Sequence, residues 1–241
     1  MQTSALHVAF ERHLEAFRTE ADTAQQYFFG YLGMRDLIAK RRDVLDEMNR
    51  NSQYWIVAHH AMIMSTFIAI GRIFDDKSKF NLGRLKHVVA RDPSLFSLLA
   101  LRDRKALLPG VDADEYIKDR HELTPAHMAA IGDEIDRWQA VYGDRYKAIR
   151  HQFAHKKFTD VAAVNQLLAK TDVEEMKSMF SFLNALHLTV WELWTNGLEP
   201  VVRPRPFVLP PDPTPADYQA GEKAYRQAQD VILTLMRGAQ T

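Results

Sequence analysis

Apolar residues recur at intervals of three to four along almost the whole chain, which is the period of an α-helix. Helices are expected over residues 4–19 and 23–48, each with one apolar face. Residues 54–74 are almost continuously apolar, and they are expected to form a central helix that is buried on most sides. The sequence contains no alternating strand patterns joined by Asn-Gly or Asp-Gly turns. The pattern therefore predicts an all-α fold, an antiparallel helical bundle.

Capping and turn residues set the expected limits of the later helices. Asp112 with Glu115 resembles a capping pair, and Thr124-Pro125 is a good start for a long helix. Asp172 is expected to cap the last core helix, and Asn196-Gly197 to close it. The expected elements are short helices at 82–90 and 95–101, a charged loop at 102–110, a long helix from 125 to about 157 and a core helix to 194.

Proline sets the expected domain organisation. Seven of the ten prolines lie between Pro200 and Pro215, so this stretch is expected to be an extended connection. A final amphipathic helix follows, and its apolar stripe must be buried on the core or on a partner chain. The expected parts are a helical domain over 1–199, a proline-rich linker over 200–215 and a C-terminal helix over 216–241.

Composition narrows the function classes only slightly. The 31 basic and 31 acidic residues balance, so any binding of nucleic acid must come from local clusters. The absence of cysteine excludes disulfides and thiolate chemistry and fits a cytoplasmic location. Residues 54–74 have the length of a membrane span, but His59-His60, Ser65-Thr66 and Arg72 favour a core helix. We expect no membrane association.

One segment concentrates the candidate chemistry. Arginine keeps its charge at any working pH and can bind phosphate oxygens, and histidine can transfer a proton near neutrality. Together these groups could promote attack on a phosphodiester without a metal: one moves the proton of the ribose 2′-hydroxyl, and the other stabilises charge on the phosphate. The basic or titratable side chains between positions 145 and 157 are Arg145, Lys147, Arg150, His151, His155, Lys156 and Lys157.

The same residues allow other interpretations. On one straight helix Arg150 and His155 are separated by about 140°, so a frayed helix end or a symmetric dimer would be needed to bring them together. A basic helix C-terminus also suits the helix dipole without any catalysis. His151 and His155 have the spacing of two metal ligands, but Gln152 stands where a metalloprotease needs glutamate, and no third ligand is evident. No cofactor or metal is expected.

The segment resembles the Arg, polar residue, spacer, His motif of the HEPN superfamily. A second stretch, Gly71-Arg72-Ile73-Phe74-Asp75-Asp76 followed by Asn81-Leu82-Gly83-Arg84-Leu85, resembles the abortive-infection U-type branch. The resemblance implies a helical bundle that works as a homodimer. It implies that Arg150, His155 and His151 are catalytic. Arg72 and Asp75 stand three apart on one helix, so the simpler expectation is that they pair with each other; the alternative is that Arg72, Asp75 or Asp76 orients the catalytic residues. Arg145, Lys147, Lys156 and Lys157 are the expected substrate-binding residues.

The resemblance implies a metal-independent endoribonuclease that acts in phage defence or as a growth-arresting toxin. Attack by the ribose 2′-hydroxyl would leave a 2′,3′-cyclic phosphate, so RNA is the expected partner and DNA is not. An antitoxin or regulatory protein is a further possible partner. The alternative is a non-catalytic module that binds RNA or a protein through the same basic helix end.

Overall fold

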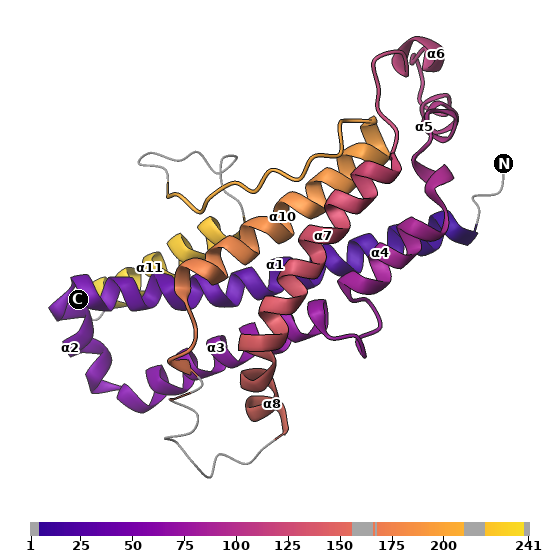
Figure 1. The fold of residues 1–241 in the computed structure, drawn as a ribbon. Coiled ribbons are helices and arrows are strands. Elements are labelled where there is room, and N and C mark those ends of the chain that lie inside the picture. Colours follow the sequence, from indigo (N-terminus) through magenta and orange to yellow (C-terminus); the bar gives the residue numbers. More distant parts are fainter. Residues whose placement is uncertain (1–4, 156–165, 167, 210–219, 239–241) are drawn as a thin grey trace. The chain divides into compact units, whose positions relative to one another are not determined.

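The computed structural model describes residues 5–155, 166, 168–209 and 220–238, and within these residues it contains helices and no strand. The predicted all-α fold class is therefore confirmed (Figure 1). In chain order the elements are α1 (Ala5–Lys40), α2 (Arg42–Arg50), α3 (Ser52–Phe74), α4 (Leu82–Arg91), the 3-10 helix η1 (Pro93–Phe96), α5 (Leu98–Lys105), α6 (Ala113–Tyr116), α7 (Pro125–Val141), the π-helix η2 (Tyr142–Tyr146), α8 (Lys147–His155), α10 (Val173–Asn196) and α11 (Ala220–Gly238).

The chain forms two compact units, each assembled from three separate stretches of sequence. Unit 1 contains Met1–Thr19, Arg72–Arg145 and Thr171–Pro206, and unit 2 contains Glu20–Gly71, Tyr146–Lys170 and Phe207–Thr241. The expected division into a domain over 1–199, a linker and a C-terminal helix stays a prediction.

Aromatic side chains fill the core of unit 1. Phe10, near the start of α1, packs against Phe96 and Trp194, with ring centroids 5.1 and 5.5 Å away. Trp138 of α7 stacks on Phe182 of α10 at 5.9 Å. Burying rings of this size is a large share of what holds helices together. These contacts join α1, η1, α7 and α10 within the unit.

Side-chain caps begin the helices of unit 1 as the sequence predicts. The Thr124 hydroxyl accepts a hydrogen bond from the backbone N–H of His127, and the Thr124 N–H donates to the His127 imidazole. Asp112 and Asp172 accept from backbone N–H groups in the first turns of α6 and α10. Gly197 ends α10 with φ of 64°, a conformation that glycine adopts without strain.

The C-terminal helix α11 packs within its own chain in unit 2. Its Ile232 belongs to a buried cluster with Met34 and Leu37 of α1 and with Val44 and Met48 of α2. The structure thus provides an intramolecular site for the apolar stripe that the sequence predicts for this helix. The residues before α11, 210–219, lie outside the described part of the chain.

Close approach of α11 to α1 depends on a glycine. A Cβ atom added to Gly33 would overlap the backbone carbonyl oxygen of Tyr225. The Tyr225 hydroxyl donates a hydrogen bond to Asp36, with 2.8 Å between the oxygens. Burial and this carboxylate together raise the pKa of Tyr225 to about 12. The close approach at Gly33 and the hydrogen bond between Tyr225 and Asp36 therefore hold α11 against α1 at neighbouring positions.

Two predicted helix limits are wrong in the first 110 residues. The expected break between residues 19 and 23 is absent, because no glycine or proline interrupts this stretch, and Ala21 and Ala24 are buried. The helix breaks instead at Arg41, which is extended and bonds to Asp43 through its guanidinium. The loop expected over 102–110 begins as helix, since Ser97 caps α5 and the last turn of α5 is basic.

The apolar helix α3 is less buried than its composition predicts. Its second half carries fully buried side chains, including Phe67 and Ile70, but Ile56 and Val57 in its first half are 67% and 61% exposed. In the described part of the chain, α3 is the helix that is long and apolar enough to cross a membrane, and a third of its most apolar window is buried. One such helix is weak evidence for a membrane span.

Candidate functional site

A π-helical turn interrupts the long helix that the sequence predicts over residues 125–157. Five residues, Tyr142–Tyr146, form this turn between α7 and α8. Turns of this kind insert one residue into an α-helix and are frequent at functional sites. The prediction of one regular helix is therefore wrong at the start of the motif.

Buried tyrosines fix both ends of the π turn. Tyr142 stacks on Phe74 in unit 1, with ring centroids 5.5 Å apart and planes inclined by 18°. Tyr146, fully buried in unit 2, stacks on Phe67 at 6.0 Å. The turn contains Gly143, and at each of its ends a tyrosine ring stacks on a phenylalanine of α3.

Arg150 lies on a glycine of α3. A Cβ atom added to Gly71 would overlap the Cδ and Nε atoms of Arg150. The Nε atom is buried, and the residue as a whole is half-buried. Since a guanidinium is costly to bury, such a position is typical of an arginine held for a specific contact. Gly71 therefore determines where the Arg150 side chain runs.

The predicted histidines share the short helix α8 with Arg150. His151 is exposed. His155 is the last residue of α8, and its side chain lies outside the described part of the structure. The helix includes His155. That the imidazole of His155 meets Arg150, within one chain or across a dimer, stays a prediction.

The predicted substrate-binding residues have different surroundings. Arg145, in the π turn, forms an ion pair with Glu175 in the first turn of α10, with 2.8 Å between nitrogen and oxygen. This pair gives Arg145 a structural role in unit 1. Lys147 is exposed at the start of α8, and Lys156 and Lys157 lie outside the described residues. Binding of RNA by these four residues stays a prediction.

The predicted orienting residues lie in unit 1, whereas Arg150 and His151 lie in unit 2. Asp75 accepts a hydrogen bond from the backbone N–H of Lys77 at 3.1 Å. Asp76 accepts one from the side-chain amide of Gln139 at 2.9 Å. Arg72 is exposed. The role of Arg72, Asp75 and Asp76 in orienting the motif stays a prediction.

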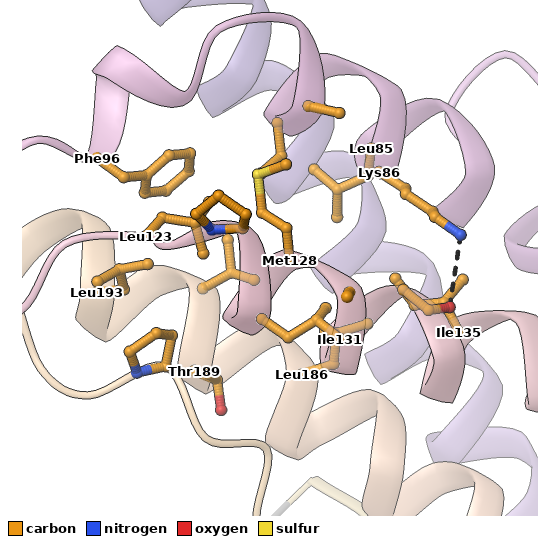
Figure 2. Close-up of a pocket in the computed structure, with 17 residues that line it drawn as sticks. Leu85, Lys86, Phe96, Leu123, Met128, Ile131, Ile135, Leu186, Thr189 and Leu193 are labelled. Atoms are coloured by element: carbon orange, nitrogen blue, oxygen red, sulfur yellow. Dashed lines mark hydrogen bonds between the residues drawn. The ribbon is translucent and has the colours of Figure 1, made fainter.

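Unit 1 also contains an apolar cavity of about 350 Å³ between α4, α7 and α10 (Figure 2). Apolar side chains such as Leu85, Met128, Ile135 and Leu186 line it (Figure 2). At its rim, the ammonium group of Lys86 is bound 2.8 Å from both carboxylate oxygens of Asp136. The cavity can hold an apolar group, and the titratable side chain of its lining, Lys86, is held in this ion pair.

Metal chemistry has no candidate centre in the described part of the chain. There, no three His, Cys, Asp or Glu side chains are grouped as a metal site requires. The side chain of His155 is outside that part, so the expectation of a metal-independent reaction stays a prediction.

The sequence analysis missed the role of Gly71. A glycine inside an apolar helix lowers helix propensity and usually has a packing reason, which is the signal that could have identified it. Its partner Arg150 lies 79 positions further along the chain, and nothing local connects the two residues.

The comparison with known families gives one match. The family model for AbiU2, of the HEPN class, matches residues 8–226. Because this match covers almost the whole chain, the protein is a HEPN protein and belongs to the AbiU2 family. The resemblance inferred from the two motifs is thereby confirmed. No curated protein and no solved structure matches the chain significantly.

Proposed function

We propose that this chain is a metal-independent endoribonuclease that acts in abortive infection, as a defence against phage or as a toxin that arrests growth. Membership of the AbiU2 family supports the general role. The Arg-x4-His segment from Arg150 to His155 supplies the two kinds of group that the chemistry needs.

The proposed reaction is an internal transfer at phosphorus. The 2′-oxygen attacks the adjacent phosphate, the bond from phosphorus to the 5′-oxygen breaks, and the leaving oxygen takes up a proton. His155 would accept the 2′-hydroxyl proton or donate the proton to the leaving group. Arg150 would stabilise the charge on the pentacovalent phosphate, and His151 would support both. The products are a 2′,3′-cyclic phosphate and a free 5′-hydroxyl.

The placement of Arg150 is the observation that carries this proposal. Its stem crosses α3 at the one position where Gly71 leaves room, and its Nε atom is buried. A solvated basic helix end would not require a glycine beneath its arginine. A guanidinium held in this way loses little conformational freedom when it binds a phosphate.

Partners and location follow from the same proposal. A homodimer would bring two copies of the motif to one cleft and so overcome the angular separation of Arg150 and His155 on one helix. RNA is the proposed substrate, an antitoxin or regulatory protein a further partner, and the cytoplasm the proposed location.

The alternative function is a non-catalytic module that binds RNA or protein through the same helix end. Replacing His155 with lysine distinguishes the two, because lysine keeps a positive charge but is a poor proton acceptor near neutrality. We expect His155→Lys to bind single-stranded RNA about as well as the wild type and to cut none. All-DNA substrate should remain intact with either protein.

Cleavage by His155→Lys at the wild-type rate would exclude the proposed role of this histidine. Cleavage of all-DNA substrate would exclude attack by the 2′-hydroxyl. RNA that is bound but cut by neither protein would favour the binding module.

A further inference from the structure

A second basic cluster lies in unit 1 around the ring of Phe80. The guanidinium carbon of Arg12 is 5.2 Å from the ring centroid, and the ammonium nitrogen of Lys79 is 5.4 Å from it. The imidazole of His13 meets the same ring edge-on, with centroids 5.0 Å apart. One half-buried aromatic ring therefore gathers two cations and a histidine from α1 and from the segment that joins α3 to α4.

A polar hollow of about 410 Å³ adjoins this cluster. His13 contributes to it from α1, and Arg84 and His87 contribute from α4. The lining includes one carboxylate, Asp76, whose Oδ1 atom is occupied by the Gln139 amide. Basic and titratable nitrogen groups thus outnumber carboxylates among the residues that line the hollow.

Asn81 makes one wall of the hollow rigid. This residue is 2% exposed, and its amide nitrogen lies 2.8 to 3.1 Å from the carbonyl oxygens of Asp75, Asp76 and Ser78. Its side-chain oxygen accepts a hydrogen bond from the backbone N–H of Arg84 at 2.8 Å. The start of α4, and with it the origin of the Arg84 side chain, is therefore fixed before any ligand arrives.

The cations of this cluster are not neutralised within the described part of the chain. There, Arg12, Lys79 and Arg84 form no ion pair with a carboxylate, whereas Lys86 and Arg145 are both paired. Partial burial, together with the positive charges of Arg84 and Arg12, lowers the pKa of His13. Arg12, Lys79 and Arg84 together outnumber the one carboxylate of the lining, Asp76, so an anion bound here would meet a net positive charge.

We propose that this hollow, with Arg12 and Lys79 at its edge, binds a backbone phosphate of the RNA chain through residues outside the Arg150–His155 segment. Arg84 would hold the phosphate through its guanidinium, and His13 and His87 would donate further hydrogen bonds. Phe80 and the cations on it offer a surface for the neighbouring base. This inference rests on the proposed function, because that function makes RNA the substrate.

A free nucleotide also carries phosphate and could bind these basic groups, but the shape of the cluster favours an RNA strand. The basic groups extend from the polar face of α1, across Lys79, to α4, which suits an extended polyanion better than a single phosphate.

The test is RNA binding by Arg84→Glu, with the matched charge reversal Lys223→Glu on the exposed face of α11 as control. Both variants are made in an Arg150→Ala/His155→Ala background, so that binding is measured without cleavage. Fluorescence anisotropy follows a labelled single-stranded RNA over a range of salt concentrations. Circular dichroism confirms that each variant is folded, and Arg12→Glu provides a second variant on a different helix.

We expect Arg84→Glu and Arg12→Glu each to weaken RNA binding about 10-fold or more, and to reduce the slope of log affinity against log salt by about one. Lys223→Glu should bind as the background protein does. Unchanged RNA affinity in both Arg84→Glu and Arg12→Glu would overturn the proposal. So would competition by a mononucleotide or inorganic phosphate at the concentration at which the strand itself competes, because the hollow would then be a site for small anions.

The two proposals fail separately. RNA binding that depends on Arg84 in a protein that cuts no RNA would retain this site and remove the nuclease. Cleavage by the wild-type motif with no dependence on Arg84 would retain the nuclease and remove this site.

Discussion

At the scale of single residues, the contact between Gly71 and Arg150 links the two sequence motifs. The first motif begins with this glycine, and the second contains this arginine. The atoms that a Cβ at Gly71 would meet belong to the outer part of a flexible side chain. A methyl group there would therefore displace the arginine and leave both backbones in place.

Gly71→Ala should accordingly separate activity from stability. We expect the variant to keep or slightly raise its melting temperature, because alanine favours a helix interior by up to about 1 kcal/mol over glycine. RNA cleavage should fall about as far as in Arg150→Ala. Thermal unfolding and a cleavage assay of the same preparations measure both.

Gly30→Ala is the matched control. Gly30 lies in α1, and an added Cβ there would find its nearest neighbour, the Met62 sulfur, at an ordinary 3.9 Å. This variant should cut RNA at the wild-type rate. Full activity in Gly71→Ala would mean that the path of Arg150 over α3 does not matter for function.

The sequence indicates Arg150 as a candidate because its chemistry and its spacing from His155 are local. It does not indicate Gly71, because the requirement for glycine arises from a side chain on another helix. The cluster around Phe80 was missed for the same reason. Arg12, His13, Lys79 and Arg84 are ordinary surface residues until the fold brings them together.

At the scale of elements, Asn81 organises the segment between α3 and α4. Its buried amide bonds to three carbonyls and caps α4, so alanine would leave several polar groups without that partner. We expect Asn81→Ala to lower the free energy of unfolding by about 2 to 3 kcal/mol, measured by urea denaturation.

Ser97→Ala offers a comparison for this cap. Ser97 also caps a helix, α5, but does so at the surface and bonds to fewer groups. Its loss should cost about 1 kcal/mol. An equal cost for the two substitutions would show that Asn81 acts only as an ordinary cap.

The packing of α11 on α1 gives another prediction for an element. Gly33→Ala places a methyl group against the Tyr225 carbonyl, and backbone cannot move aside as a long side chain can. We expect a loss of about 1 to 3 kcal/mol in the free energy of unfolding, whereas Gly30→Ala should be neutral or stabilising. Unchanged stability in Gly33→Ala would show that α11 does not rest on α1 at this residue.

Element limits could be predicted where a residue type marks them. Thr124, Asp112, Asp172 and Gly197 all act as their types indicate, because capping is a local interaction. The uninterrupted α1 and the π turn at Tyr142 could not be predicted. Burial of Ala21 and stacking of Tyr142 and Tyr146 on residues of α3 are tertiary, and Gly143 alone does not specify a π turn.

At the scale of the whole molecule, half-buried histidines make stability depend on pH. Burial and the nearby Arg18 lower the pKa of His187 in α10 to about 4, although Glu15 opposes this shift. The unfolded chain would titrate near 6.5, so it binds more protons than the folded chain between these values. The contribution of His187 to the free energy of unfolding is therefore fully present above about pH 6.5 and is lost as the pH falls towards 4.

His187→Gln should reduce this dependence. We expect the fall in melting temperature between pH 7 and pH 5 to be smaller in the variant than in the wild type. His13 and His59, whose pKa values are also lowered by burial, should retain part of the effect. An identical fall in both proteins would show that His187 does not contribute.

Membership of the AbiU2 family and the all-α fold could both be predicted from the sequence, because two short motifs and a helical period are visible in it. The grouping into two units could not, since each unit combines stretches that are far apart in the chain. The proposed function depends on neither feature but on Arg150 and His155, which would cut RNA through attack by the 2′-hydroxyl.

The most direct test incubates wild type, Arg150→Ala and His155→Ala with a mixed single-stranded RNA in excess EDTA and analyses the 3′ ends of the products. The account predicts cleavage by the wild type alone, with 2′,3′-cyclic phosphate ends. Cleavage that persists in both variants, or products that end in a 3′-hydroxyl, would contradict it.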